Sequence, residues 1–297
     1  MLFTRAAGGA EPIGFNFMDP GDNAGGPAGT YQVIEGLDPT EIAGVVPQTN
    51  WHNMTQGGTG SPPVPGGGGV TITWVTPGGG THALTSYFPP PPDFKLMRGY
   101  LDNSDNTSSP DVVTVSGLSF SLYDVICYSV GDNGSANRVS KFTLSSTNNG
   151  VLFTNITKYI MDVGGSAFDG STYTEANSTT GGASTPAGNY CRFYHIRGTN
   201  FTIKSVGEYA SDSHPRGPFN ALQVIDLTPA LSTPSYANGQ FQCFLDGASN
   251  TTYVILASTN LANPASWLPV STNTAPAQIT NTPPANTPHR FYRALLQ

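Results

Sequence analysis

Residues 111–145 read DVVTVSGLSFSLYDVICYSVGDNGSANRVSKFTLS, and this stretch decides the fold class. It holds three short runs, 111–118, 123–130 and 138–145, in which apolar and polar residues tend to alternate. A period of two is typical of β-strands with one buried face, and the Gly, Asp and Asn residues between the runs are typical of turns. We therefore predict consecutive antiparallel strands here, and the same pattern extends along the chain in both directions.

Seven further runs in the first 228 residues have the same character, and almost nothing has the period of a helix. They are residues 12–17, 69–75, 95–102, 150–157, 189–196, 201–209 and 220–227. About ten antiparallel strands joined by glycine-rich loops predict two packed sheets. The predicted fold class is therefore all-β, with a β-sandwich of the jelly-roll type over residues 12–228.

The composition changes at 227–240, LTPALSTPSYANGQ, where Pro, Ser and Thr accumulate. We predict a linker over 229–239, followed by a small immunoglobulin-like domain over 240–297. Its strand-like runs are 241–246, 252–258, 267–271, 277–281 and 289–296. An immunoglobulin-like sandwich has about seven strands in about a hundred residues. Five runs are too few to complete both sheets, so we expect this domain to present an open edge or groove.

Composition and charge limit the classes of function. Charged residues make up 10% of the 297 residues, and the chain contains 35 Gly and 25 Pro. Such a composition is typical of extracellular β-proteins, so we expect an extracellular or cell-surface location. A net charge of −7 without a basic run argues against nucleic-acid binding. No apolar stretch has the length of a membrane span, and any secretion signal is expected to lie outside this chain.

Seven motifs occur in a fixed order between residues 12 and 228. They are PIGFNF, IAGVVPQTNWHNM, VTITW, MRGYLD, VTVSGL, YDVICYSVGDNG and RGPFNALQVIDL. This order, and above all the phrase GVVPQTNW, resembles a family of secreted β-sandwich proteins from environmental bacteria of the planctomycete and verrucomicrobial type. The resemblance implies a jelly-roll fold and an extracellular compartment, and it implies no biochemical activity.

The last block carries a second resemblance. Tyr253, the sequence STNL at 258–261, Trp267 and the sequence RFYR at 290–293 follow one another in it. This order resembles a small carboxy-terminal immunoglobulin-like module of the same bacteria. Secreted β-sandwiches joined in this way also resemble subunits of environmental extracellular fibrils. The resemblance implies a structural protein whose partners are copies of itself.

A catalytic constellation is not evident in the sequence. The five histidines form no HxH, HExxH or HxxxH pattern, the glycine runs precede no helix, and no pair of carboxylates stands out. We predict that the chain is not an enzyme and needs no cofactor. The oxygen-rich stretch LDNSDN at 101–106 makes Asp102 and Asp105 candidate calcium ligands. An Asx-turn explains the same residues more simply.

The three cysteines leave two interpretations open. Cys127 and Cys191 lie in strand-like runs and could form a disulfide, which would leave Cys243 unpaired. Three buried free thiols are an equal alternative.

The leading hypothesis is a subunit of an extracellular filament that assembles head to tail by strand donation. Residues 1–11 precede the first sandwich strand and would form a donor arm, with Phe3 as its anchor. The predicted donor residues are Leu2, Phe3, Thr4, Arg5 and Ala6. The predicted acceptor residues in the small domain are Phe241, Cys243, Leu245, Phe291, Arg293 and Leu295.

The alternative hypothesis is a secreted carbohydrate-binding or adhesion module. Trp51 and Trp74 would then form a platform for a sugar ring. Glycans are also candidate partners through modification, because seven Asn-x-Ser/Thr sequences occur. Their asparagines are Asn53, Asn106, Asn133, Asn155, Asn177, Asn200 and Asn250.

Overall fold

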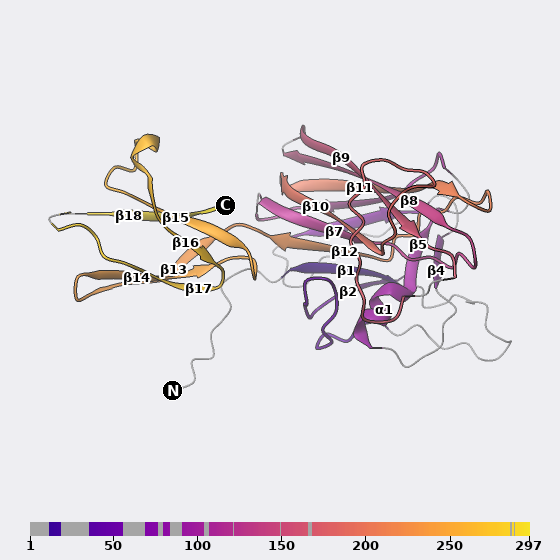
Figure 1. The fold of residues 1–297 in the computed structure, drawn as a ribbon, viewed down its shortest axis with the longest axis horizontal. Helices are drawn as coiled ribbons and strands as arrows, with labels where there is room; N and C mark the ends of the chain where they lie inside the picture. The colour runs from indigo at the N-terminus through magenta and orange to yellow at the C-terminus, as the bar shows by residue number, and fades with distance from the viewer. Residues whose placement is uncertain are drawn as a thin grey trace. The chain divides into compact units, whose positions relative to one another are not determined.

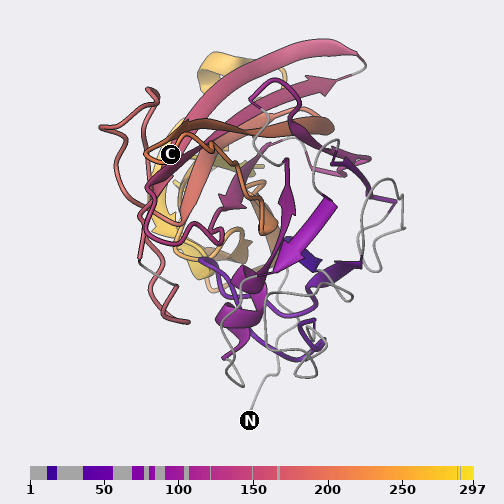
Figure 2. The same ribbon diagram turned by 90° about the vertical axis from the view of Figure 1, so that its right-hand side faces the viewer.

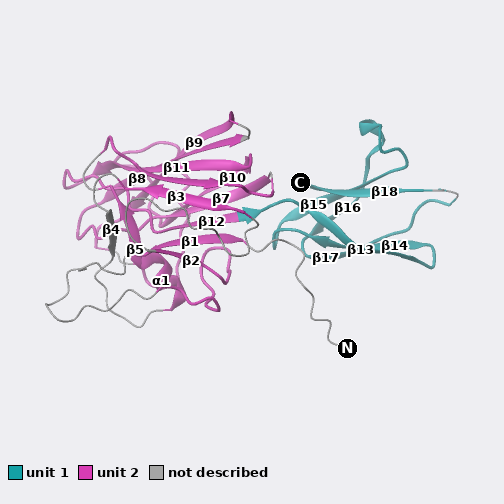
Figure 3. Cartoon of the chain, turned by 180° about the vertical axis from the view of Figure 1, so that it is seen from behind, with its two compact units in different colours: residues 1–11, 225–297 teal, residues 12–224 magenta. Residues whose placement is uncertain are grey.

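The computed structural model describes two compact units, Pro12–Val224 and Ile225–Gln297, called here the large and the small sandwich (Figure 3). The described residues are 12–18, 36–55, 69–76, 80–83, 91–103, 107–120, 122–148, 150–165, 168–285, 287 and 289–297. They are nearly all in strands and connecting loops (Figure 1). Among them, no helix is long and apolar enough to cross a membrane.

Two five-stranded sheets make up most of the large sandwich. The first has the order β10-β7-β12-β1-β2, with bounds Tyr190–Arg197, Leu122–Tyr128, Ala221–Asp226, Ile13–Met18 and His52–Thr55. The second has the order β3-β6-β11-β8-β9, with bounds Thr71–Val75, Asp111–Ser116, Asn200–Ala210, Arg138–Asn148 and Val151–Asp162. The β8–β9 hairpin is the longest in this sheet (Figure 2, pink).

Eight of these strands have the order of a jelly roll. Numbered one to eight along the chain, β1 and β6 to β12 lie as 6-3-8-1 in the first sheet and 2-7-4-5 in the second. The pairs β1–β12, β7–β10, β6–β11, β8–β11 and β8–β9 are all antiparallel. The predicted jelly-roll sandwich is therefore confirmed. Beyond these eight, β2 adds to β1 in parallel and β3 adds to β6.

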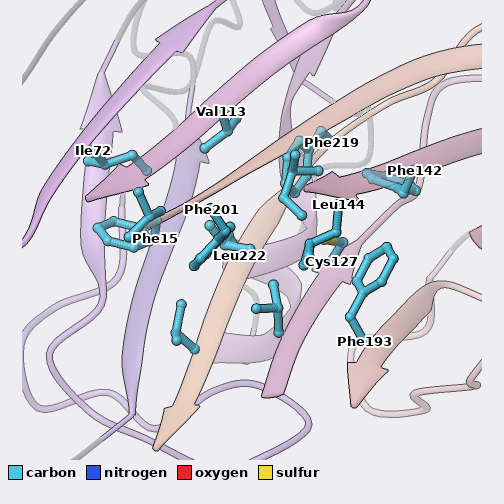
Figure 4. Close-up of a cluster of buried hydrophobic side chains, with 14 of the residues drawn as sticks. Phe15, Ile72, Val113, Cys127, Phe142, Leu144, Phe193, Phe201, Phe219 and Leu222 are labelled. Carbon is cyan, nitrogen blue, oxygen red and sulfur yellow. The ribbon is translucent and has the colours of Figure 1, made fainter. Parts of the chain in front are cut away.

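The core of the large sandwich fills the space between its two sheets (Figure 4). Alternation along each strand supplies it, since Val113 and Val115 of β6 are fully buried while Thr114 between them is partly exposed. Aromatic rings bridge the layers. The Phe219 ring meets Phe17 and Phe142 edge to face, with ring centroids 5.2 and 5.1 Å apart.

Residues 95–102 differ from the prediction of a single strand. A short helix, α1 (Pro92–Arg98), takes the first half, and strand β5 (Gly99–Asp102) takes the second half and pairs with β4 (Gly80–Ala83). Proline in the first turn of α1 favours a helix start, because its φ is already fixed there. The buried face of the helix is formed by Phe94, Leu96, Met97 and Arg98.

The small sandwich consists of two three-stranded sheets. One has the order β13-β14-β17, with bounds Ala230–Ala237, Gln240–Asp246 and Ala277–Asn281. The other has the order β16-β15-β18, with bounds Leu268–Thr274, Thr252–Ser258 and Phe291–Leu296. A 3₁₀ turn, η1 (Pro264–Ser266), precedes β16. The core between the sheets includes Cys243, Leu245, Tyr253, Ile255 and Ile279.

The predicted linker over 229–239 is wrong, because most of it forms β13, which pairs with β14. The physical reason lies in the turn between these strands. Asn238 and Gly239 have φ angles of 53° and 78°, as a tight hairpin turn requires, and Asn-Gly is the commonest sequence for such a turn. The small sandwich therefore begins before residue 240.

Candidate functional site

The free edge of β18 is the feature of the small sandwich that could bind another chain. In its sheet, β18 lies at the end of the order β16-β15-β18 and pairs with β15 alone. In an antiparallel edge strand, about half of the backbone N–H and C=O groups point away from the one neighbour. Within the described residues, no further strand lies beside this edge, so it presents a template for strand addition.

The strand order indicates which strand would complete the sheet. An immunoglobulin sandwich places strands A, B and E in one sheet and strands C, F and G in the other, with C′ beside C where it occurs. The orders β13-β14-β17 and β16-β15-β18 correspond to A-B-E and C′-C-F. Strand G, which would follow F at its free edge, has no counterpart among the described residues. The position beside β18 is therefore the place for one more strand.

Burial of side chains supports the same view. Cys243 of β14 and Tyr253 and Ile255 of β15, the central strands, are at most 1% exposed. On β18 the inward residues Tyr292 and Ala294, like Leu296, pack against the core and yet stay partly exposed. An additional strand beside β18 would remove part of this apolar surface from water, which is favourable.

A groove of about 980 Å³ lies at the end of the small sandwich where β18 begins. It is lined by Tyr236, Gly239, Phe241, Thr282, Pro283, Pro284, Ala285, Thr287, His289, Arg290 and Tyr292. The rings of Phe241 and Tyr292 stack at 4.0 Å with an interplanar angle of 5°. The side chain of Tyr236 is 66% exposed beside them. The groove therefore offers aromatic surface next to the free strand edge.

The edge of β13, on the same side of the small sandwich, is a poorer template. Strands β13 and β18 approach each other as the outer strands of their sheets. Strand β13 contains Pro234, which has no N–H group, and its register with β14 shifts between Ser232 and Ser235. Thr233 in this bulge has a φ of 48°. Strand β18 has no proline and keeps an unbroken register with β15, so it is the edge that can accept a strand.

Two arginines, Arg290 and Arg293, carry the positive charge at this site. His289 and Arg290 line the groove at the start of β18. On the outer face of the sheet, the guanidinium of Arg293 lies 4.3 Å from the centroid of the Trp267 ring, an arrangement of the cation–π type. Partial burial raises the pKa of Tyr292, while Arg290 lowers it, and the Tyr292 hydroxyl donates to Asn281 Oδ1 at 2.9 Å.

The structure corrects the predicted acceptor residues. Strand β14 is central in its sheet, so the backbone around Cys243 and Leu245 is already paired on both sides, and both side chains are buried. Along β18 the inward residues are Tyr292, Ala294 and Leu296, while Arg293 and the 45% exposed Leu295 lie on the outer face.

Four of the six predicted residues lie at the site, because Arg293 and Leu295 belong to β18 and Phe241 and Phe291 lie beside or on it. Phe241 lines the groove, and Phe291, beside His289, begins the free strand β18. The predicted donor, Leu2 to Ala6, lies outside the described residues.

The predicted sugar platform is wrong. The side chains of Trp51 and Trp74 are 4% and 5% exposed. The Trp51 indole N–H donates to the carbonyl of Ala43 at 3.2 Å, and Trp74 packs in the core of the large sandwich beside Phe17. Neither ring presents a face to solvent, so neither can stack on a sugar.

The motif GVVPQTNW at 44–51 has a structural role. The Tyr128 hydroxyl accepts from the Val45 N–H at 2.8 Å and donates to Gln223 Oε1 at 2.9 Å. The Gln223 amide nitrogen donates to the Val46 carbonyl and to Gln48 Oε1, both at 2.6 Å. The motif is thus fastened to β7 and β12 by buried polar groups, which explains why it combines apolar residues with Gln48.

Of the two predicted calcium ligands, Asp102 and Asp105, the structure describes Asp102 alone. Asp105 lies outside the described residues. The carboxylate of Asp102 is 1% exposed and lies 3.2 Å from the Arg216 guanidinium. Across residues 12–297, gaps excepted, no group of three or more His, Cys, Asp or Glu is arranged to hold a metal ion. Calcium binding stays a prediction.

Asp111, which the sequence did not single out, has the most unusual carboxylate of the chain's described part. It is fully buried at the start of β6, and neither of its oxygens has a hydrogen-bond partner. Burial, with a smaller effect of the Asp102 charge, raises its pKa to about 9. Asp111 is therefore a neutral acid at pH 7.

A smaller pocket of about 230 Å³ contains two carboxylates, Asp162 and Asp169. Burial raises the pKa of Asp162 to about 7, and its Oδ2 accepts from the Gly131 N–H at 2.8 Å. Hydrogen bonds from Thr172 and Ser171 lower the pKa of Asp169 to about 2. Those bonds close a turn around Asp169, so this carboxylate has a structural task.

Cys127 and Cys191 lie directly opposite each other on β7 and β10, and both are free thiols buried in the core of the large sandwich. Burial raises the pKa of the Cys127 thiol, and the adjacent Cys191 raises it further. Cys243 is a free thiol in the core of the small sandwich. The structure thus has three buried thiols.

The candidate glycosylation sites differ in exposure. Asn53, Asn155, Asn177 and Asn250 are exposed, and Asn106 lies outside the described residues. Asn133 is buried and donates to the Asp162 carbonyl, so the folded chain cannot carry a glycan there. Asn53 and Asn200 hold backbone groups through their side chains. Asn53 Oδ1 accepts from the Leu37 N–H, and Asn200 Oδ1 accepts from the Gly117 N–H.

No protein-family model matches the chain, and no curated protein is similar enough to it to count as a match.

Proposed function

We propose that the chain is a structural subunit of an extracellular filament, in which each copy donates its N-terminal arm to the small sandwich of the next copy. The observation that carries the proposal is the free edge of β18, whose inward side chains are only partly buried. The small sandwich then completes its second sheet with a strand from a neighbour. The low charge and high Gly, Ser, Thr and Asn content suit a protein that works outside the cell.

Strand donation would supply both affinity and direction. Main-chain hydrogen bonds along β18 give affinity, and alternate side chains of the donor meet the partly buried core residues. The donor and the acceptor are different surfaces of one chain, so the contact is head to tail. A head-to-tail contact that does not close on itself propagates as a fibre.

The test compares the full chain with a variant that lacks residues 1–11. Under negative-stain electron microscopy we expect filaments from the full chain and folded monomers from the deletion. A matched control replaces residues 2–6 with a Gly/Ser sequence of equal length, which keeps the spacing and removes the strand-forming side chains. Filaments of normal length from either variant would refute the proposal.

A mixing experiment tests the polarity of the contact. The arm-deleted chain keeps its acceptor edge but cannot donate, so it should end a growing filament. A small fraction of it added to the full chain should shorten the filaments, whereas the same amount of additional full chain should not. Unchanged filament length would contradict head-to-tail donation.

A further inference from the structure

The groove beside β18 can set the register and the direction of the donated strand. This inference rests on the proposed function and concerns the same edge. The wall of the groove is aromatic, with the stacked rings of Phe241 and Tyr292 and the exposed ring of Tyr236. Aromatic pairs contribute more than their buried area alone, so a groove of this kind favours an aromatic side chain.

The N-terminal arm contains one aromatic side chain that could occupy this groove. Within residues 1–11, MLFTRAAGGAE, Phe3 is the single aromatic side chain. Successive side chains of a strand alternate between its two faces. With Phe3 facing inward, Arg5 and Ala7 share its face, while Leu2, Thr4 and Ala6 point outward.

Charge decides between the two directions of the arm. Suppose that Phe3 lies at the level of Tyr292, where the groove is. In an antiparallel arm, Arg5 then lies at the level of Arg290, which lines the groove together with His289. Like charges opposite each other are destabilising. In a parallel arm, Arg5 lies instead at the level of Ala294, whose small side chain leaves room for its aliphatic stem.

We propose that the arm of one copy lies parallel to β18 of the next copy, with Phe3 in the groove formed by Tyr236, Phe241 and Tyr292. Ala7 then lies at the level of Leu296. The small residues 8–10, GGA, continue past the end of β18 without steric conflict. Phe3 thus fixes the register, and Arg5 fixes the direction.

Cysteine cross-linking tests the direction. The parallel arrangement brings Ala6 of one copy next to Leu295 of another, and the antiparallel arrangement brings it next to His289. We expect the double variant Ala6→Cys/Leu295→Cys to form intermolecular disulfides under mild oxidation, and Ala6→Cys/His289→Cys to form far fewer. The native chain is the blank, because its three cysteines are buried. The opposite order of cross-linking would overturn the parallel arrangement.

Peptide binding tests the register separately. A synthetic peptide of residues 1–11 is titrated into the arm-deleted chain and followed by fluorescence anisotropy. Phe3→Ala in the peptide should weaken binding by about tenfold or more, as the loss of a buried aromatic side chain predicts. The matched change Leu2→Ala, on the outward face, should alter the affinity by less than threefold. A larger effect of Leu2→Ala would overturn the assignment of Phe3.

The outcomes separate this inference from the function on which it rests. If the Phe3→Ala peptide binds as tightly as the native peptide, Phe3 does not occupy the groove. Strand donation itself is not refuted by that result. No binding of the native peptide, together with a full chain that stays monomeric, refutes both. A peptide of residues 84–93, LTSYFPPPPD, serves as a competitor, because aromatic grooves also bind polyproline segments. If this peptide binds in place of residues 1–11, the assignment of the arm is wrong.

Discussion

Replacing Asp111 with Asn should change how the stability of the large sandwich depends on pH. The carboxylate of Asp111 has a pKa of about 9 in the folded chain, against an ordinary value of 3.8, mainly because it is buried. Between these two values the folded chain holds a proton that the unfolded chain releases. The stability that depends on this proton is fully present below pH 4 and is lost as the pH rises to about 9.

The magnitude follows from the width of that window. Each pH unit within it corresponds to about 1.4 kcal/mol of unfolding free energy. Between pH 5 and pH 8 the native chain should therefore lose about 4 kcal/mol relative to Asp111→Asn. The buried amide of the variant adds a cost of about 1–3 kcal/mol, but this cost is the same at every pH. The slope, and not the absolute difference, is the readout.

The assay is guanidinium unfolding of both chains at pH 5, 6, 7 and 8. A Trp267→Phe background leaves Trp51 and Trp74, both buried in the large sandwich, as the fluorescent reporters. Asp162→Asn is a matched control. Burial raises the pKa of Asp162 to about 7, so its difference from the native chain should level off above pH 7. A difference for Asp111→Asn that stays constant from pH 5 to pH 8 would refute the reasoning.

Three further predictions concern packing. Phe219→Ala, which removes a buried ring in contact with Phe17 and Phe142, should lower the unfolding free energy by about 3–5 kcal/mol in chemical denaturation. Gly99→Ala should destabilise the fold by about 1–3 kcal/mol in the same assay, because the new Cβ would lie 2.4 Å from a backbone carbonyl oxygen of β1; an unchanged midpoint would contradict this close packing. A thiol reagent should modify none of the three cysteines in the native chain and all three in denaturant, as intact mass would show.

The sequence was sufficient to predict the sheets but not several of their details. Alternation in the runs around residues 111–145 is a local property, and it corresponds directly to β6, β7 and β8. The short, mostly apolar run at 94–97 is compatible with a strand and with a helix. The proline in the first turn of α1 favours the helix. Strand β13 was not predicted because its Pro-, Ser- and Thr-rich sequence is typical of a linker. The Asn-Gly pair that follows it was the signal for a hairpin.

The candidate site depends on strand pairing and on contacts between distant segments, which no single stretch of sequence specifies. The inward face of β18 holds Tyr292 and Ala294 because of its pairing register with β15, which the sequence of β18 does not specify. The burial of Trp51 depends on the loop that the Tyr128 and Gln223 side chains hold in place. Local composition did predict a domain short of strands, because the number of strand-like runs is visible in the sequence.

Pro234 and the bulge around Thr233 have a consequence for the architecture of any filament built by this route. They leave one usable strand edge on the open side of the small sandwich, so a subunit there can receive one arm and not two. Through this contact, each subunit gives one strand to a neighbour and receives one strand from another. Such a polymer would be unbranched, and its two ends would be chemically different, one with an empty groove and one with an unused arm. Growth could therefore be controlled at either end by a different binding partner.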